Sequence, residues 1–105
     1  MRKIIALAVL FLSTAVIADD RVTVSGLQVG KADAGYPAVL GIAHNNTNAT
    51  LENVFVKFKL YDSAGNVVGN TVAHGQDIGP GESWKFSAPA TQRFEKVTLS
   101  DVKIY

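Results

Sequence analysis

The feature that most constrains the fold of this chain is a strict alternation of side chains over residues 53–61. Every second residue there is a large apolar one: Val54, Val56, Phe58 and Leu60. The positions between them include Lys57 and Lys59. Successive side chains of a β-strand point to opposite faces of its sheet, so this period of two predicts a strand with one buried face and one face in water.

The chain after residue 18 predicts further strands of the same kind. Short runs rich in β-branched and aromatic residues are separated by Gly, Pro, Asn and Asp, and no stretch has apolar residues at helical spacing. We expect six or seven antiparallel strands, including residues 22–30, 37–44, 53–61, 67–73, 82–88 and 96–105. Pro80-Gly81 fits the centre of a type II turn. The pattern is typical of an all-β sandwich.

The strand patterns also predict irregularities and a core. Gly26 is expected to mark a bulge, and a change of phase between Leu99 and Val102 predicts another bulge near Ser100-Asp101. Outside the 53–61 strand, we expect these side chains to face the core: Val22, Val24, Leu27, Val29, Val39, Ala43, Trp84 and Phe86.

The first eighteen residues have a composition of their own. Arg2 and Lys3 form a short basic start, residues 4–12 are an unbroken apolar run, and small or β-branched residues follow. This is the three-part layout of a secretory signal peptide. It predicts cleavage between Ala18 and Asp19.

An uncleaved membrane anchor is the alternative to a signal peptide. The apolar stretch of residues 4–18 is shorter than the roughly 20 residues that span a bilayer, which favours cleavage. We therefore expect a signal peptide at residues 1–18 and one β-sandwich domain at residues 19–105. The mature protein is expected in the bacterial periplasm or outside the cell, with no membrane attachment.

Charge and composition argue against several classes of function. Removing Arg2 and Lys3 from the ten basic residues leaves eight against nine acidic ones, a nearly neutral domain without the basic excess typical of nucleic-acid binding. The chain has no cysteine, and its one methionine, Met1, leaves with the signal peptide. The carboxylates are scattered, and no pattern predicts the paired acids of a hydrolase. We expect neither enzymatic activity nor a cofactor.

Residues 58–62 read Phe-Lys-Leu-Tyr-Asp. With flanking residues at matching spacing over about residues 38–89, this segment resembles the FxLYD domain family of small bacterial exported or membrane-anchored proteins. The supporting residues are Gly41, Asn45-Asn46-Thr47, Leu51, Asn53-Val54, Gly65, Val67-Val68-Gly69, Pro80-Gly81-Glu82, Trp84 and Phe86. The resemblance implies an immunoglobulin-like β-sandwich in which Asp62 and Gly65 close a hairpin. It implies no catalytic site.

Phe55, Lys57, Lys59 and Tyr61 share the outward face of the 53–61 strand, and this face is the first candidate binding surface. Rigid rings give contact area at small entropic cost, so such a face suits a peptide, an acyl group or a sugar. The expected partner is another envelope or secreted protein, bound by this face or by an edge strand. The alternative is that Tyr36 or neighbouring loops cover the rings and that the lysines only keep the sheet soluble. The sequence does not indicate the oligomeric state.

The two histidines carry the second candidate function. His44 and His74, with Asp77 as a third ligand, would form a metal or small-ligand site if their strands end at the same pole. Their spacing matches no known metal pattern, and two exposed histidines at loop edges are the alternative. The expected function is a non-catalytic interaction or structural module, with small-ligand or metal binding as the second possibility.

Overall fold

The computed structural model describes residues 16–32 and 34–105, and within them the chain folds into seven strands. The bounds are β1 (Val16–Asp19), β2 (Val22–Lys31), β3 (Pro37–Asn45), β4 (Leu51–Tyr61), β5 (Val67–Ile78), β6 (Ser83–Pro89) and β7 (Lys96–Ile104). Most of the predicted signal peptide, residues 1–15, lies outside the described residues.

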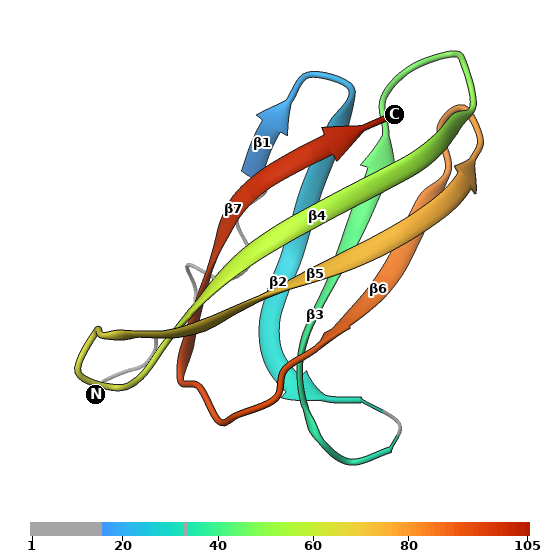
Figure 1. Ribbon diagram of the computed structural model, residues 1–105. Coiled ribbons are helices and arrows are strands. Elements are labelled where there is room, and N and C mark those ends of the chain that lie inside the picture. Colours follow the sequence, from blue (N-terminus) through green and yellow to red (C-terminus); the bar gives the residue numbers. More distant parts are fainter. Residues whose placement is uncertain (1–15, 33) are drawn as a thin grey trace, which may run out of the picture.

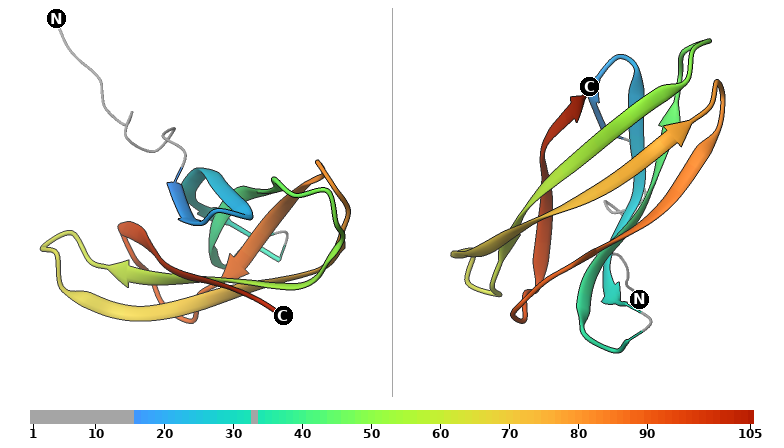
Figure 2. Two further views of the ribbon diagram at one scale, coloured as in Figure 1. Left: turned by 90° about the horizontal axis from the view of Figure 1, so that it is seen from above. Right: turned by 45° about the vertical axis from the view of Figure 1, so that its right-hand side comes forward.

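The strands form two antiparallel sheets, one with the order β1-β2-β3-β6 and the other with the order β5-β4-β7. The three-stranded sheet lies in front of the four-stranded one in Figure 1, and its strands cross the others obliquely. Figure 2 shows the two layers from other directions. The predicted all-β sandwich of six or seven strands is confirmed. In the part of the chain described, no helix is long and apolar enough to cross a membrane.

The core lies between the two sheets and is built by alternate residues of the strands. On β4, Val54, Val56 and Phe58 are at most 1% exposed, as the alternation predicts. Phe58 meets Phe86 of the opposite sheet, with ring centroids 5.5 Å apart. The core is thus assembled from the inward faces of both sheets.

Both predicted bulges are present. In the pairing of β2 with β3 the register shifts between Ser25 and Gln28, and Gly26 has a positive φ of 64°. In the pairing of β4 with β7 the partners jump from Leu99 to Asp101, which leaves Ser100 as the extra residue. A bulge inserts one residue and changes which side chains face inward, as the sequence pattern indicated.

The predicted turns are confirmed as well. The backbone N–H of Glu82 donates to the carbonyl of Gly79 across Pro80-Gly81, and Gly81 has a φ of 73°, as a type II turn requires. Between β4 and β5, one carboxylate oxygen of Asp62 accepts hydrogen bonds from the N–H groups of Ala64 and Asn66.

Two expectations need correction. Val29 is 41% exposed, although it lies opposite the buried Val39. The reason is that β1 pairs only with the Val22–Val24 end of β2. At Val29, β2 is paired with β3 alone and forms the edge of the sheet. The strand that begins at Val67 was expected to end near residue 73, but it continues to Ile78.

Candidate functional site

The outer face of the three-stranded sheet holds all four residues of the first candidate surface. Val54 and Val56 point into the core, so Phe55, Lys57, Lys59 and Tyr61 point outward from β4, the central strand. Directly opposed residues of neighbouring strands share a face. The register therefore adds these residues: His74, Val72, Asn70 and Val67 of β5, with Lys96, Thr98, Asp101 and Lys103 of β7. We call this surface the basic face.

One end of the basic face is an aromatic cluster centred on Phe55. The ring of Phe55 stacks on His74, with centroids 4.2 Å apart and planes 4° apart. Tyr105 meets the Phe55 ring edge-on at 5.7 Å. His74 is held by a hydrogen bond of 3.0 Å between its Nε2 and Asn53 Oδ1. The cluster thus fixes Phe55 while leaving the Tyr105 ring largely exposed.

Positive charge dominates the middle of the basic face. Four lysines lie on it, at positions 57, 59, 96 and 103, against the single carboxylate of Asp101. In the described residues the two ion pairs join Arg21 to Asp19 and Lys103 to Asp101. The ammonium groups of Lys57 and Lys59 therefore have no carboxylate partner within the described structure.

Two hollows meet at Lys57. The smaller one, of about 170 Å³, is lined by Phe55, Lys57, Lys103 and Tyr105. The larger one, of about 540 Å³, is lined by Lys57, Phe58, Lys59, Asn70, Thr71, Val72 and Ser100. The Lys57 ammonium thus lies between an aromatic hollow and a more polar one, an arrangement that suits an anionic group with an apolar neighbour on the Phe55 side.

The alternative that Tyr36 or loops cover the rings does not describe Phe55. Its ring neighbours are His74 of the same sheet and Tyr105, which directly follows β7. Tyr61 is half-buried, and its hydroxyl lies 3.3 Å from Thr98 Oγ1 on the adjacent strand. Tyr36 lies in the connection between β2 and β3 of the other sheet and is 44% exposed.

The structure does not bring together His44, His74 and Asp77. His44 lies on β3 of the four-stranded sheet, where its Nδ1 is 2.8 Å from Ser83 Oγ, whereas His74 lies on β5 of the other sheet. No group of three or more His, Asp or Glu side chains in the described residues is placed to hold a metal ion. The ends of β3 and β5 do lie close together, since Asn45 Nδ2 is 2.9 Å from the carbonyl oxygen of Ile78. His44 and His74 nevertheless alternate with buried residues and belong to different sheets, so the two imidazoles do not form a common site.

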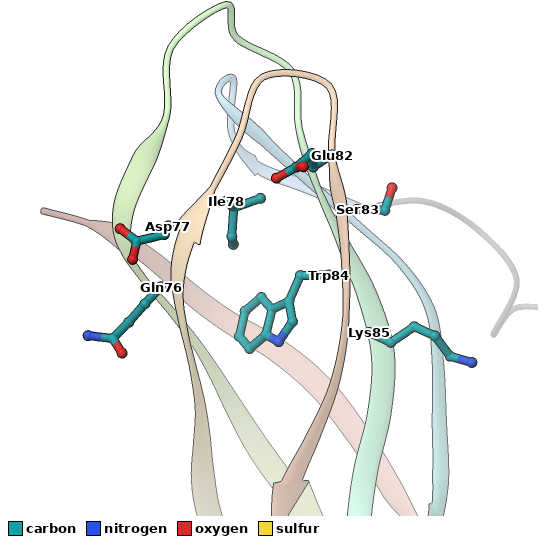
Figure 3. A pocket seen from close by; sticks show the side chains of 7 residues that line it. All are labelled: Gln76, Asp77, Ile78, Glu82, Ser83, Trp84 and Lys85. Atoms are coloured by element: carbon teal, nitrogen blue, oxygen red, sulfur yellow. The ribbon is translucent and has the colours of Figure 1, made fainter.

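A third hollow, of about 460 Å³, opens between β5 and β6 beside Trp84 (Figure 3). The indole of Trp84 lies between the two strands, while Gln76, Asp77 and Lys85 point away from it. Gly75 lies against the indole, since a Cβ built there would come within 2.8 Å of the ring. The polar groups diverge, so this hollow lacks the convergent polar groups of a ligand pocket.

Asn45 is a structural residue that the sequence pattern did not reveal. It is buried, and its Nδ2 lies 2.9 Å from the carbonyl oxygens of Ala49, Ile78 and Gly79. Its Oδ1 accepts hydrogen bonds from the N–H and hydroxyl of Thr47. The residue ties the connection after β3 to the turn before β6. A polar run of Asn and Thr gave no sign that one of its members is buried.

The expected cleavage position falls at the end of β1. Ile17 pairs with Thr23 and Asp19 with Val22, so Ala18 and Asp19 belong to the described β1–β2 hairpin. The Asp19 carboxylate accepts hydrogen bonds from the backbone N–H and the guanidinium of Arg21, and the guanidinium bond is the main cause that lowers the pKa of Asp19. Cleavage between Ala18 and Asp19 stays a prediction.

The fold and the basic face define the class of this protein as an antiparallel two-sheet β-sandwich with a lysine-rich, aromatic outer sheet face. Comparisons of the chain with models of protein families, with curated proteins and with solved structures found no match.

Proposed function

We propose that this protein is a non-catalytic interaction module of the bacterial cell envelope. In this proposal a signal peptide at residues 1–18 directs export, and the remaining domain binds another envelope or secreted protein. The binding surface is the basic face. No cofactor, nucleic acid or membrane takes part.

One observation carries the proposal: Lys57 and Lys59 follow the aromatic cluster along β4 and have no carboxylate partner among the described residues. An ion pair on the surface gains little energy in water and costs the lysine side-chain entropy. Unpaired lysines on a surface are therefore common and do not by themselves indicate a binding site. Here, however, they lie next to the exposed Val72 and Tyr105. Exposed apolar groups among charges are typical of interaction surfaces.

The proposal includes membership of the FxLYD domain family, with its immunoglobulin-like sandwich. Two features support it. Phe58 and Leu60 of the motif are buried on β4, which agrees with their expected role in the core. Asp62 and Gly65 close the β4–β5 hairpin, where Gly65 has a φ of 89°.

Capture of partners from the envelope fraction tests the binding surface. We expect the tagged protein to retain a partner that is lost when Lys57 and Lys59 are both replaced by Glu. The matched control replaces Lys31 and Lys85 by Glu, because these exposed lysines lie on the four-stranded sheet. An identical set of partners for both double variants would remove the basic face from the proposal.

Export is tested separately by the mature N-terminus. We expect the protein expressed in its bacterial host to be released with the periplasm or the medium, and to begin at Asp19. Recovery of the chain in the cytoplasm with Met1 still attached would contradict the signal peptide.

A further inference from the structure

The spacing of the outward residues of β4 gives the basic face a direction. Phe55, Lys57, Lys59 and Tyr61 follow one another at every second position of one strand. Because a strand rises about 3.3 Å per residue, neighbouring groups in this row are separated by about 7 Å. The row therefore begins with the ring of Phe55, continues with the ammonium groups of Lys57 and Lys59, and ends with the ring of Tyr61.

An extended peptide has the same period. Its side chains at every second position also point to one side and are about 7 Å apart. Carboxylates two residues apart in such a peptide would match Lys57 and Lys59, and apolar side chains two residues further along would match the two rings. The hollow lined by Phe55, Lys57, Lys103 and Tyr105 lies where one of these apolar side chains would fall.

The charges around the row determine which sign of charge a ligand should carry. Lys96 and Lys103 flank it on β7, and the one carboxylate there, Asp101, is paired with Lys103 at 3.6 Å. Charges of opposite sign on two partners speed their association and fix the register in which they bind, whereas charges of the same sign weaken binding. The face thus favours an acidic partner and disfavours a basic one.

We propose that the basic face binds an extended acidic segment of its partner with the pattern apolar-x-acidic-x-acidic-x-apolar. The segment lies along β4, with its two carboxylates on Lys57 and Lys59 and its apolar ends on the Phe55 cluster and on Tyr61. The inference rests on the proposed function and names the chemistry of the partner.

A synthetic peptide tests the inference directly. The probe is a blocked peptide of the sequence Leu-Thr-Glu-Thr-Glu-Thr-Leu, and the full domain is observed by NMR. We expect shifts in the backbone amides of β4 and in the His74 ring. Replacing both Lys57 and Lys59 by Glu should weaken binding by about tenfold or more, whereas the Lys31 and Lys85 double variant should change it less than about twofold. Both variants keep their core residues, and their amide spectra verify that they fold.

Three control ligands decide the chemistry. A peptide with Gln in place of Glu, and one with the two Glu residues adjacent, should both bind at least several-fold more weakly. Equal binding by either would overturn the roles given to charge and spacing. Polygalacturonate and vesicles of phosphatidylglycerol should not shift the same signals more than the probe does. A preference for either would replace the peptide by an anionic glycan or lipid surface.

Failure of this inference can be distinguished from failure of the proposed function. If a protein partner is lost on reversal of Lys57 and Lys59 while the acidic probe causes no shift, the module binds by this face but not through an acidic extended segment. If the probe binds as expected and no envelope partner depends on the two lysines, the acidic specificity stands and the proposed role in the envelope is wrong.

Discussion

The rings of Phe55 and His74 lie parallel on neighbouring strands, with 4.2 Å between their centroids. The pairing of β4 with β5 sets this relationship, because the two residues are direct partners in the register. The stack turns an otherwise exposed phenylalanine into a fixed part of the basic face. It also gives the face a spectroscopic reporter, since His74 is one of two histidines in the chain.

Replacing Phe55 by Leu should change the resonances of the His74 ring, because the ring current of the stacked neighbour is removed. The resonances of His44, on the other sheet, are the internal control and should not move. The cost in stability should be about 1 kcal/mol, the size of an aromatic pair outside the core. NMR of the histidine side chains at fixed pH measures the first effect, and urea unfolding measures the second. An unmoved His74 signal would show that the rings are not stacked in solution.

Replacing Phe58 by Ala should cost roughly 3–5 kcal/mol of unfolding free energy, because the side chain is 1% exposed and packs against Phe86. The adjacent Lys57→Ala is the matched control on the outer face and should stay within about 0.5 kcal/mol. Denaturant unfolding of both variants gives the two values. Equal stabilities would mean that the inward and outward faces of β4 are exchanged.

The alternation over residues 53–61 predicted the core side of β4 and its solvent side, because a period of two depends only on the local chain. It did not predict which residue of β5 lies beside Phe55. That depends on a register shift near the hairpin, where Leu60 pairs with Gly69 but Tyr61 pairs with Val67. A shift of one residue in this pairing would place a different side chain on Phe55.

The separation of the two histidines and the burial of Asn45 could not be predicted for the same reason. Both depend on contacts between segments distant in the sequence, which no local pattern contains. Asn45 reaches carbonyl groups 33 and 34 residues further along the chain. A shared site of His44 and His74 was the second possibility, and it depended on the placement of their strands, which belong to different sheets. The outward direction of the four residues of the row on β4, in contrast, was predicted correctly because one strand holds them all.

Replacing Gly75 by Ala should destabilise the protein by about 1–3 kcal/mol. The added methyl would come within 2.8–2.9 Å of three atoms of the Trp84 ring, which is wedged between β5 and β6. Gly69→Ala on the same strand is the control, since its methyl meets the flexible end of Gln92 at 3.2 Å. Trp84 is the sole tryptophan, so its fluorescence reports both unfolding and any displacement of the ring. Equal stability of the two variants would show that the indole has room to move.

Replacing Asn45 by Asp should cost about 3 kcal/mol, because it removes the Nδ2 donor and places a carboxylate among three carbonyl oxygens. The neighbouring Asn46→Asp is the control: Asn46 is exposed and donates from its Nδ2 to Thr23 Oγ1. Urea unfolding at neutral pH measures the difference between the two variants. A penalty of the same size for both would mean that Asn45 is not buried in solution.

The carboxylate of Asp62 should make the stability of the hairpin depend on pH. Its pKa is lowered from the usual 3.8, first by the backbone N–H of Asn66 and then by the Asn66 side chain and the N–H groups of Ala64 and Gly65. Because the pKa is lower in the folded state than in the unfolded one, the carboxylate stabilises the protein above the ordinary Asp pKa, and this contribution disappears as the pH falls through the folded value. Asp62→Asn should therefore melt at a lower temperature than the unchanged protein at pH 7, and the gap should narrow steadily below about pH 4. Ser63→Ala, in the same loop, is the control and should show no such narrowing. If the difference in melting temperature between Asp62→Asn and the unchanged protein stays constant down to the lowest pH measured, the carboxylate does not hold this turn.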